Sequence, residues 1–321
     1  MTKILSIARN TFIETLRQPV YLIIIIAALL LFLLSPSLSM YTMSDDNKLL
    51  RELGLSTLFI TSLFIAIFSA SGAVADEIEN KTITTVLSKP VKRPIFIIAK
   101  FFGVFAAVAL AHYICTIALL MAIRHGVIGA VWETHDWTVI LTAAVSIALA
   151  MLLTAFFNFA YDWKFSSTMV GLLAVFATLA LIFLFFIDRN WQFAPWNNGI
   201  NALDVYGSIL LLLAAMIIVA LAVAFSARFN IVVTLAVCVG FFLLGLVSDY
   251  VFGRIAEAHL WAKICYFLVP NLQIFWISDA IYEESQDFHV KYILNTASYA
   301  ISYTTAILAI AVALFQRREV G

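Results

Sequence analysis

Long apolar runs separated by short polar segments dominate this chain of 321 residues. A helix needs roughly 20 apolar residues to cross the hydrocarbon core of a bilayer, and runs of about that length recur along the sequence. They lie near residues 20–40, 55–75, 97–123, 138–160, 167–187, 205–226, 231–248 and 293–315. The pattern predicts an all-α fold: a polytopic transmembrane helical bundle of about eight spans, forming a single domain over residues 1–321.

The first 18 residues follow a different pattern, because charged residues alternate with apolar ones at helical spacing. Lys3, Arg9, Glu14 and Arg17 lie off the apolar positions, and Pro19 follows directly. This pattern predicts an interfacial elbow helix over residues 1–18 that lies flat at the membrane surface. A polar lead-in with chance periodicity is the alternative. The apolar positions are Ile4, Leu5, Ala8, Phe12 and Leu16.

The stretch 249–292 carries two shorter apolar pieces, Leu260–Val269 and Leu272–Ile281, separated by Pro270 and Asn271. Each piece is too short to cross about 30 Å of hydrocarbon. We therefore expect residues 249–292 to form an external or re-entrant segment with short interfacial helices.

The distribution of Lys and Arg indicates the orientation, because cytoplasmic loops of membrane proteins carry an excess of both. Eight spans place both termini on one side, together with the loop 76–94 and most of the 19 Lys and Arg residues. We predict a multi-pass protein of the cytoplasmic (inner) membrane with both termini in the cytoplasm. Six spans would give the same sidedness if 202–248 formed no crossing pair, but that run is long and apolar.

Composition agrees with a lipid partner and argues against a nucleic-acid partner. Hydrophobic residues make up 64% of the chain and charged residues 12%, and the formal net charge is zero. No phosphate-binding GxxxxGK[ST] loop, HExxH or GxSxG motif occurs in the sequence, so we expect a non-catalytic chain. His125, His135, Glu133 and Asp136 share one predicted external loop, which we interpret as solvated, with no metal site.

One ionisable residue, His112, lies clearly inside a predicted span. A neutral imidazole there can hydrogen-bond to a neighbouring helix, and the alternative is an intramembrane polar site for substrate or protons. Ion-coupled secondary transporters generally need more buried charge than this sequence shows. That class, with His112 and Asp249 titrating, stays as an alternative function, and a polytopic membrane enzyme or assembly factor is another.

The segment 76–94, DEIENKTITTVLSKPVKRP, is the most distinctive polar stretch. Glu77 and Glu79 lie where carboxylates favour the start of a short helix, and Pro90 ends it. Lys92 and Arg93 then return the chain to the anionic membrane surface. The pattern predicts either a short cytoplasmic amphipathic helix over residues 77–88 or a solvated loop on the positive side.

This segment resembles the first cytoplasmic loop of ABC-2 type permeases, the membrane subunits of ATP-binding cassette transporters. Matching positions are Glu77, Glu79 and Thr82, followed by Leu87-Ser88-Lys89-Pro90-Val91-Lys92-Arg93 and then Lys100 and Gly103. The elbow residues Ala8–Phe12, Glu14, Leu16 and Arg17, the external Pro270-Asn271-Leu272 with Phe275 and Asp279, and the tail Phe315–Glu319 are similar to the family in the same order. The family commonly has six spans, so we expect an added pair of spans around 205–248.

The resemblance implies a permease subunit of an ABC transporter, an exporter in most members of the family. Such a chain pairs with a second permease chain, identical or different, to form the pathway in the lipid bilayer. It has no cofactor of its own, since ATP and Mg²⁺ bind to separate ABC ATPase subunits. The resemblance assigns ATPase coupling to Glu77, Glu79, Thr82, Leu87, Pro90 and Arg93.

Overall fold

The computed structural model describes residues 2–39, 46–75, 93–128, 135–194, 201–256, 259–278 and 290–316. Within these ranges the chain is helical apart from short connections and one isolated antiparallel bridge between Ile187 and Phe193. This confirms the all-α fold class.

Eight helices in the described residues are long and apolar enough to cross a membrane, which confirms the predicted number of spans. A π-helical turn, η1 (Ser71–Ala75), extends the second of them. The eight are α2 (Pro19–Ser39), α3 (Asp46–Ala70), α6 (Arg93–His125), α7 (Trp137–Tyr161), α8 (Phe165–Phe186), α9 (Ala202–Ser226), α10 (Ile231–Val251) and α13 (Val290–Gln316).

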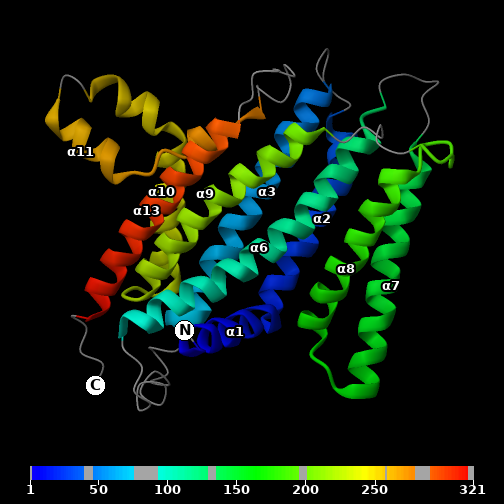
Figure 1. Ribbon diagram of the computed structural model, residues 1–321, viewed down its shortest axis with the longest axis horizontal. Coiled ribbons are helices and arrows are strands. Elements are labelled where there is room, and N and C mark those ends of the chain that lie inside the picture. The colour runs from blue at the N-terminus through cyan, green and yellow to red at the C-terminus, as the bar shows by residue number, and fades with distance from the viewer. Residues whose placement is uncertain are drawn as a thin grey trace.

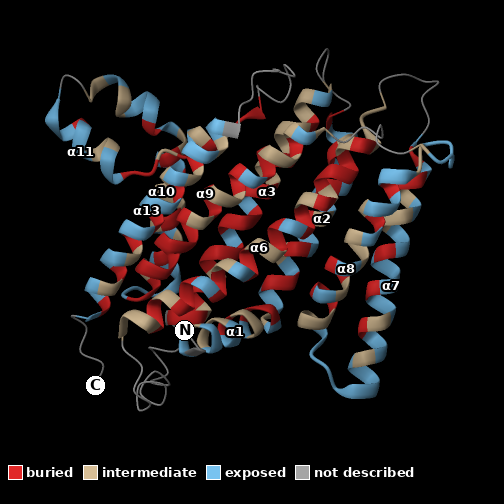
Figure 2. Cartoon of the chain, viewed as in Figure 1, coloured by how far each residue is buried: buried red, intermediate tan, exposed pale blue. Residues whose placement is uncertain are grey.

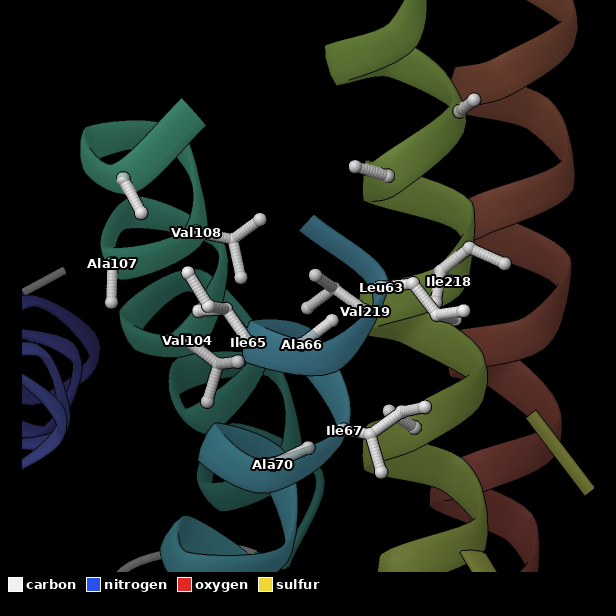
Figure 3. Close-up of a cluster of buried hydrophobic side chains, with 14 of the residues drawn as sticks. Leu63, Ile65, Ala66, Ile67, Ala70, Val104, Ala107, Val108, Ile218 and Val219 are labelled. Carbon is white, nitrogen blue, oxygen red and sulfur yellow. The ribbon is translucent and has the colours of Figure 1, made fainter. Parts of the chain in front are cut away.

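Helix α9 lies at the centre of the bundle and packs against α3, α6, α10 and α13 (Figure 1). Several of its small residues are fully buried, among them Ala214, Ala215, Ala220 and Ala222. Small side chains let neighbouring helices approach closely, which is how membrane helices gain packing contact without a hydrophobic driving force. Figure 3 shows the resulting core of α3, α6 and α9, with Ile65, Ala66, Ile67, Val104, Val108, Ile218 and Val219 among its side chains.

Helices α7 and α8 form a hairpin at one side of the bundle, and α7 is the least buried of the eight (Figure 2). Asp136 caps the start of α7, and Asp162, in the left-handed region with φ 53°, ends it. The stretch 205–248, where the resemblance implies an added pair of spans, forms the two spanning helices α9 and α10. That stretch supplies α9, the most buried helix, whereas the pair at the periphery is α7 and α8.

Helix α1 (Thr2–Arg17) lies across one end of the bundle, against the first turns of α6 (Figure 1). The last turn of α13 reaches the same end, which we call the α1 end. Both ends of the described chain therefore lie on one side of the bundle, as an even number of spans requires.

At the opposite end, the chain between α10 and α13 forms η2 (Gly253–Ile255), α11 (Leu260–Leu268) and η3 (Gln273–Phe275). The first short apolar piece is helical as predicted. The described part of the second piece contains the 3-10 turn η3 and one helical residue, Ser278. Leu272 and Phe275 are fully buried, so this turn is inserted into the bundle and does not lie on its surface.

Candidate coupling surface and buried polar contacts

Arg93 is the one predicted coupling residue that the structure describes, and it begins α6. Glu77, Glu79, Thr82, Leu87 and Pro90 lie outside the described residues. The candidate site is therefore built from its frame, meaning the elements on either side of residues 76–92 and the helices that touch them.

The first side of this frame is the contact between α1 and α6 at Gly103. A Cβ atom added to Gly103 would lie 2.6 Å from the carbonyl oxygen of Ala8 and 2.6 Å from Cβ of Thr11. Real Cβ atoms do not approach other atoms so closely, so only glycine permits this contact. Thr11 and Thr15 are about 1% exposed beneath the helix crossing. Helix α1 is thereby fixed to the third turn of α6.

The inward face of α1 keeps most of the apolar positions that periodicity predicts, since Leu16 is buried and Phe12 packs against the core. Leu5 is 72% exposed, whereas Thr11 and Thr15 are buried against the bundle. Threonine suits this position because a short side chain permits the close approach at Gly103. The close helix crossing at Gly103 therefore adds two threonines to this apolar face.

The second side of the frame is η1, which immediately precedes residue 76. A Cβ atom added to Gly72 would collide with the side-chain amide of Gln18, at the junction of α1 and α2. The hydroxyl of Ser166, in the first turn of α8, donates to the carbonyl of Leu16 at 2.8 Å. The end of α1 is therefore in contact with both η1 and α8.

The third side joins the start of α6 to the end of α13. The Arg93 guanidinium donates to the carbonyl of Gln316 at 2.9 Å. This carbonyl lies at the C-terminal end of α13, where the helix dipole favours a cation. Below it, the buried rings of Phe96 and Phe315 stack with centroids 5.8 Å apart. The Lys100 ammonium lies 5.6 Å from the Phe96 ring centroid. The described elements on either side of residues 76–92 thus pack into the bundle: η1 lies against α1 and α3, and α6 lies against α1 and α13.

His112 makes hydrogen bonds to two other helices in the middle of the bundle. Its Nδ1 lies 2.9 Å from the Ser62 hydroxyl of α3, and its Nε2 lies 2.9 Å from the Ser208 carbonyl of α9. A carbonyl only accepts, so Nε2 donates to Ser208, and Nδ1 of a neutral ring accepts from Ser62. The single hydroxyl proton of Ser62 then goes to the ring and not to the Leu58 carbonyl, which lies 2.9 Å from the same hydroxyl oxygen. The ring is 3% exposed and both nitrogens have partners in its neutral form. The ring thus links α3, α6 and α9, and the choice between a structural role and an intramembrane polar site stays a prediction.

Further buried ionisable residues accompany His112 in the described part of the chain. Lys100, Arg124 and Asp204 are all less than 5% exposed within helices of spanning length. Asp204, in the first turn of α9, forms an ion pair with Arg51 of α3 at 3.1 Å. These residues lie near helix ends, and Arg51 and Lys48 fall before the start predicted for the second span. The charged residues just before that predicted span were the sequence signal for an ion pair at this end of the helix.

Arg124, at the end of α6, belongs to a second charged cluster. Like the pair of Arg51 and Asp204, this cluster lies at the end of the bundle opposite α1. Its Nε lies 3.5 Å from Asp136 Oδ2, and Arg189 Nε lies 3.5 Å from the same oxygen. Arg124 also donates to the carbonyls of Leu184 and Ile187. The cluster ties the α7–α8 hairpin to α6. Asp136 therefore has a structural position in contact with two arginines, in place of the solvated loop predicted for it.

Metal ligands do not gather in the part of the chain that the structure describes, where no group of three or more His, Cys, Asp or Glu could hold an ion. The His125 and His135 rings do lie near each other, with centroids 5.6 Å apart.

Comparison of the sequence with models of known protein families gives no match, and comparison with curated proteins gives no significant match.

Proposed function

We propose that this chain is the membrane-spanning subunit of an ATP-driven transporter of the ABC-2 permease type. Separate ATPase subunits would bind residues 76–94 and drive the bundle, and this chain would hydrolyse nothing itself. The observation that carries the proposal is the frame around that segment. The segment is joined to the bundle by η1 and by the start of α6, and these two elements pack against α1, α3 and α13. A force applied to the segment therefore acts on packed helices.

The residues that carry the family resemblance support the proposal through their positions. Gly103 and Thr11 meet where α1 crosses α6, and Arg93 bonds to the end of α13. Leu272 and Phe275 belong to the external stretch that resembles the family, and both are fully buried at the other end of the bundle. Residues matched by motif alone therefore coincide with close contacts that hold the helices together.

The mechanism follows from the close packing of the frame. ATP binding closes a pair of ATPase subunits and displaces the segment 77–88 seated on them. Because α1 and the first turns of α6 are in close contact at Gly103, they move together. The pathway between this chain and a second permease chain then changes the side to which it opens. ATP thereby biases a two-state element through a subunit that holds no nucleotide.

An ion-coupled secondary transporter is the second candidate, and His112 is the residue that it would need. Both ring nitrogens of His112 are already bonded to Ser62 and Ser208. The further charged residues form two ion pairs near helix ends, Arg51 with Asp204 and Arg124 with Asp136. Transport that continues after removal of every ATPase would favour this candidate over the permease.

Purification of the full chain in mild detergent from its own membrane tests the proposal. We expect an ATP-hydrolysing subunit to co-purify, and the double charge reversal Glu77→Lys with Glu79→Lys to reduce its recovery at least tenfold. Lys164→Glu is the control, because it reverses an exposed charge in the α7–α8 turn at the same end of the bundle. Equal ATPase recovery with all three proteins, or none with any, would contradict the proposal.

A further inference from the structure

Helix α11 exposes a continuous apolar stripe although it is firmly attached to the rest of the protein. Leu260, Trp261, Ile264, Phe267 and Leu268 are each 52–83% exposed, and their spacing places them on one side of a nine-residue helix. Ala262, on the other side, is fully buried. An amphipathic helix normally turns its apolar side inward, so the orientation of α11 requires a separate explanation.

Hydrogen bonds from three elements fix this orientation. The Tyr266 hydroxyl donates to Asp249 of α10 at 3.2 Å, and the Tyr303 hydroxyl of α13 donates to the carbonyl of Leu268 at 2.6 Å. The side-chain amide of Asn271 donates to the Tyr266 hydroxyl at 3.3 Å. These contacts hold the polar side of α11 to the bundle, so the apolar stripe faces outward as a fixed feature.

The surroundings of the stripe indicate what covers it. Val247, Tyr250 and Val251, at the end of α10, are also exposed, and α10 is long and apolar enough to span a membrane. The stripe therefore continues the apolar surface that the bundle turns toward hydrocarbon. Figure 1 places α11 at the flank of the bundle, beside the end of α10 that leads into it.

Residues at the edges of the stripe are those that favour the headgroup region. The Arg254 guanidinium lies 4.3 Å from the Tyr250 ring centroid, and the His259 ring stacks on Trp261 with centroids 6.1 Å apart. Lys263 is exposed along the edge of the helix. Tyrosine and tryptophan gather at membrane interfaces, and basic groups there meet lipid phosphates.

We propose that α11 is a lipid-binding helix that lies in the bilayer interface at the end opposite α1. Its apolar stripe enters the boundary between headgroups and acyl chains, and Arg254 and Lys263 contact lipid phosphates. The helix neither crosses the membrane nor re-enters it, since its other side is bonded to α10 and α13. This inference depends on the membrane-spanning bundle and not on the proposed permease function.

Nitroxide labels on the full chain in nanodiscs of phosphatidylcholine and phosphatidylglycerol test the proposal. Labels are placed by Ile264→Cys and Phe267→Cys in the stripe, in a background without the native cysteines. Lys263→Cys is the control on the polar edge of the same helix, and Leu152→Cys, exposed on α7, is the hydrocarbon reference. Power saturation compares access of oxygen, which concentrates in lipid, with access of a water-soluble nickel chelate.

We expect labels at 264 and 267 to favour oxygen as the label at 152 does, and the label at 263 to favour the nickel chelate. Nickel access at 264 and 267 equal to that at 263 would place the stripe in water and overturn the proposal. Immobile labels with low access to both reagents would show a protein partner or a second copy, and would overturn it equally. Two stripe positions keep the test decisive if one variant misfolds.

Discussion

At the residue scale, single glycines decide how the helices meet. Gly103 permits the crossing of α1 over α6, where an added Cβ would lie 2.6 Å from both the Ala8 carbonyl oxygen and Thr11 Cβ. We expect Gly103→Ala to lower stability by about 1–3 kcal/mol through overpacking. Gly171→Ala is the control, because nothing lies within 4 Å of its added Cβ and alanine favours the helix. Thermal unfolding in detergent should separate the two variants, and equal midpoints would contradict the close crossing.

His112 provides a second test at this scale. His112→Ala leaves the Ser208 carbonyl and the Ser62 hydroxyl without their ring partner, which costs about 1–3 kcal/mol when such groups are buried. Glutamine also carries a donor and an acceptor, so His112→Gln should recover much of the stability and keep transport with the parent pH profile. A His112→Gln protein that is stable yet unable to transport would indicate a proton or substrate role.

The ion pair of Arg51 and Asp204 is a third residue-scale feature, and Asp204 is only 2% exposed. Removing one partner of a buried pair leaves an uncompensated charge and costs roughly 3–5 kcal/mol, whereas apolar replacement of both is often neutral. We therefore expect Arg51→Met to destabilise strongly and Arg51→Met with Asp204→Leu to restore most of the loss. Losses that simply add in the double variant, measured by thermal unfolding, would show that the two side chains act independently.

At the element scale, the turn of Pro270, Asn271 and Leu272 attaches the chain after α11 to α10. The Leu272 amide donates to the Gly245 carbonyl at 3.0 Å, and a Cβ added to Gly245 would lie 2.7 Å from the Pro270 oxygen. We expect Gly245→Ala to release residues 259–278 and increase their hydrogen exchange. Gly240→Ala, in the same helix with open space around it, should leave exchange unchanged. The same increase in both variants would contradict the attachment.

The elements themselves were largely predictable, because each span is a long apolar run. Helix α3 is the instructive exception, since it begins at Asp46 and not near 55. Its first turns contain Lys48, Arg51 and Glu52, and the low hydropathy of these residues predicts a loop. Arg51 is accommodated there because Asp204 of α9 faces it. A pattern within one segment cannot reveal a partner more than 150 residues away, so the true start of this helix was out of reach.

At the scale of the whole molecule, the packing separates a central body from a peripheral hairpin. Helices α2, α3, α6, α9, α10 and α13 pack together through α6 and α9, and α7 and α8 are attached at one side. Six is also the number of spans common in the family that the chain resembles. On the proposed function, the hairpin is an addition between the third and fourth spans of that core.

The candidate site divides in the same way between what could and could not be predicted. The resemblance pointed to Arg93, Lys100 and Gly103, and the structure brings them to one end of α6 beside α1 and α13. The contacts of Gly72 with Gln18 and of Ser166 with Leu16 carry no motif, since they depend on how remote helices cross. Glu77, Glu79, Thr82, Leu87 and Pro90 lie outside the described residues, and their role stays a prediction.

The central claim is that another protein applies force to residues 76–94, and photo-crosslinking in living cells tests it most directly. A photoreactive amino acid replaces Leu87, and a matched probe replaces Phe159, which is 92% exposed on α7. We predict that the probe at 87 crosslinks to an ATP-hydrolysing subunit, while the probe at 159 does not. Crosslinks from position 87 to lipid alone, or to proteins on the far side of the membrane, would contradict the account.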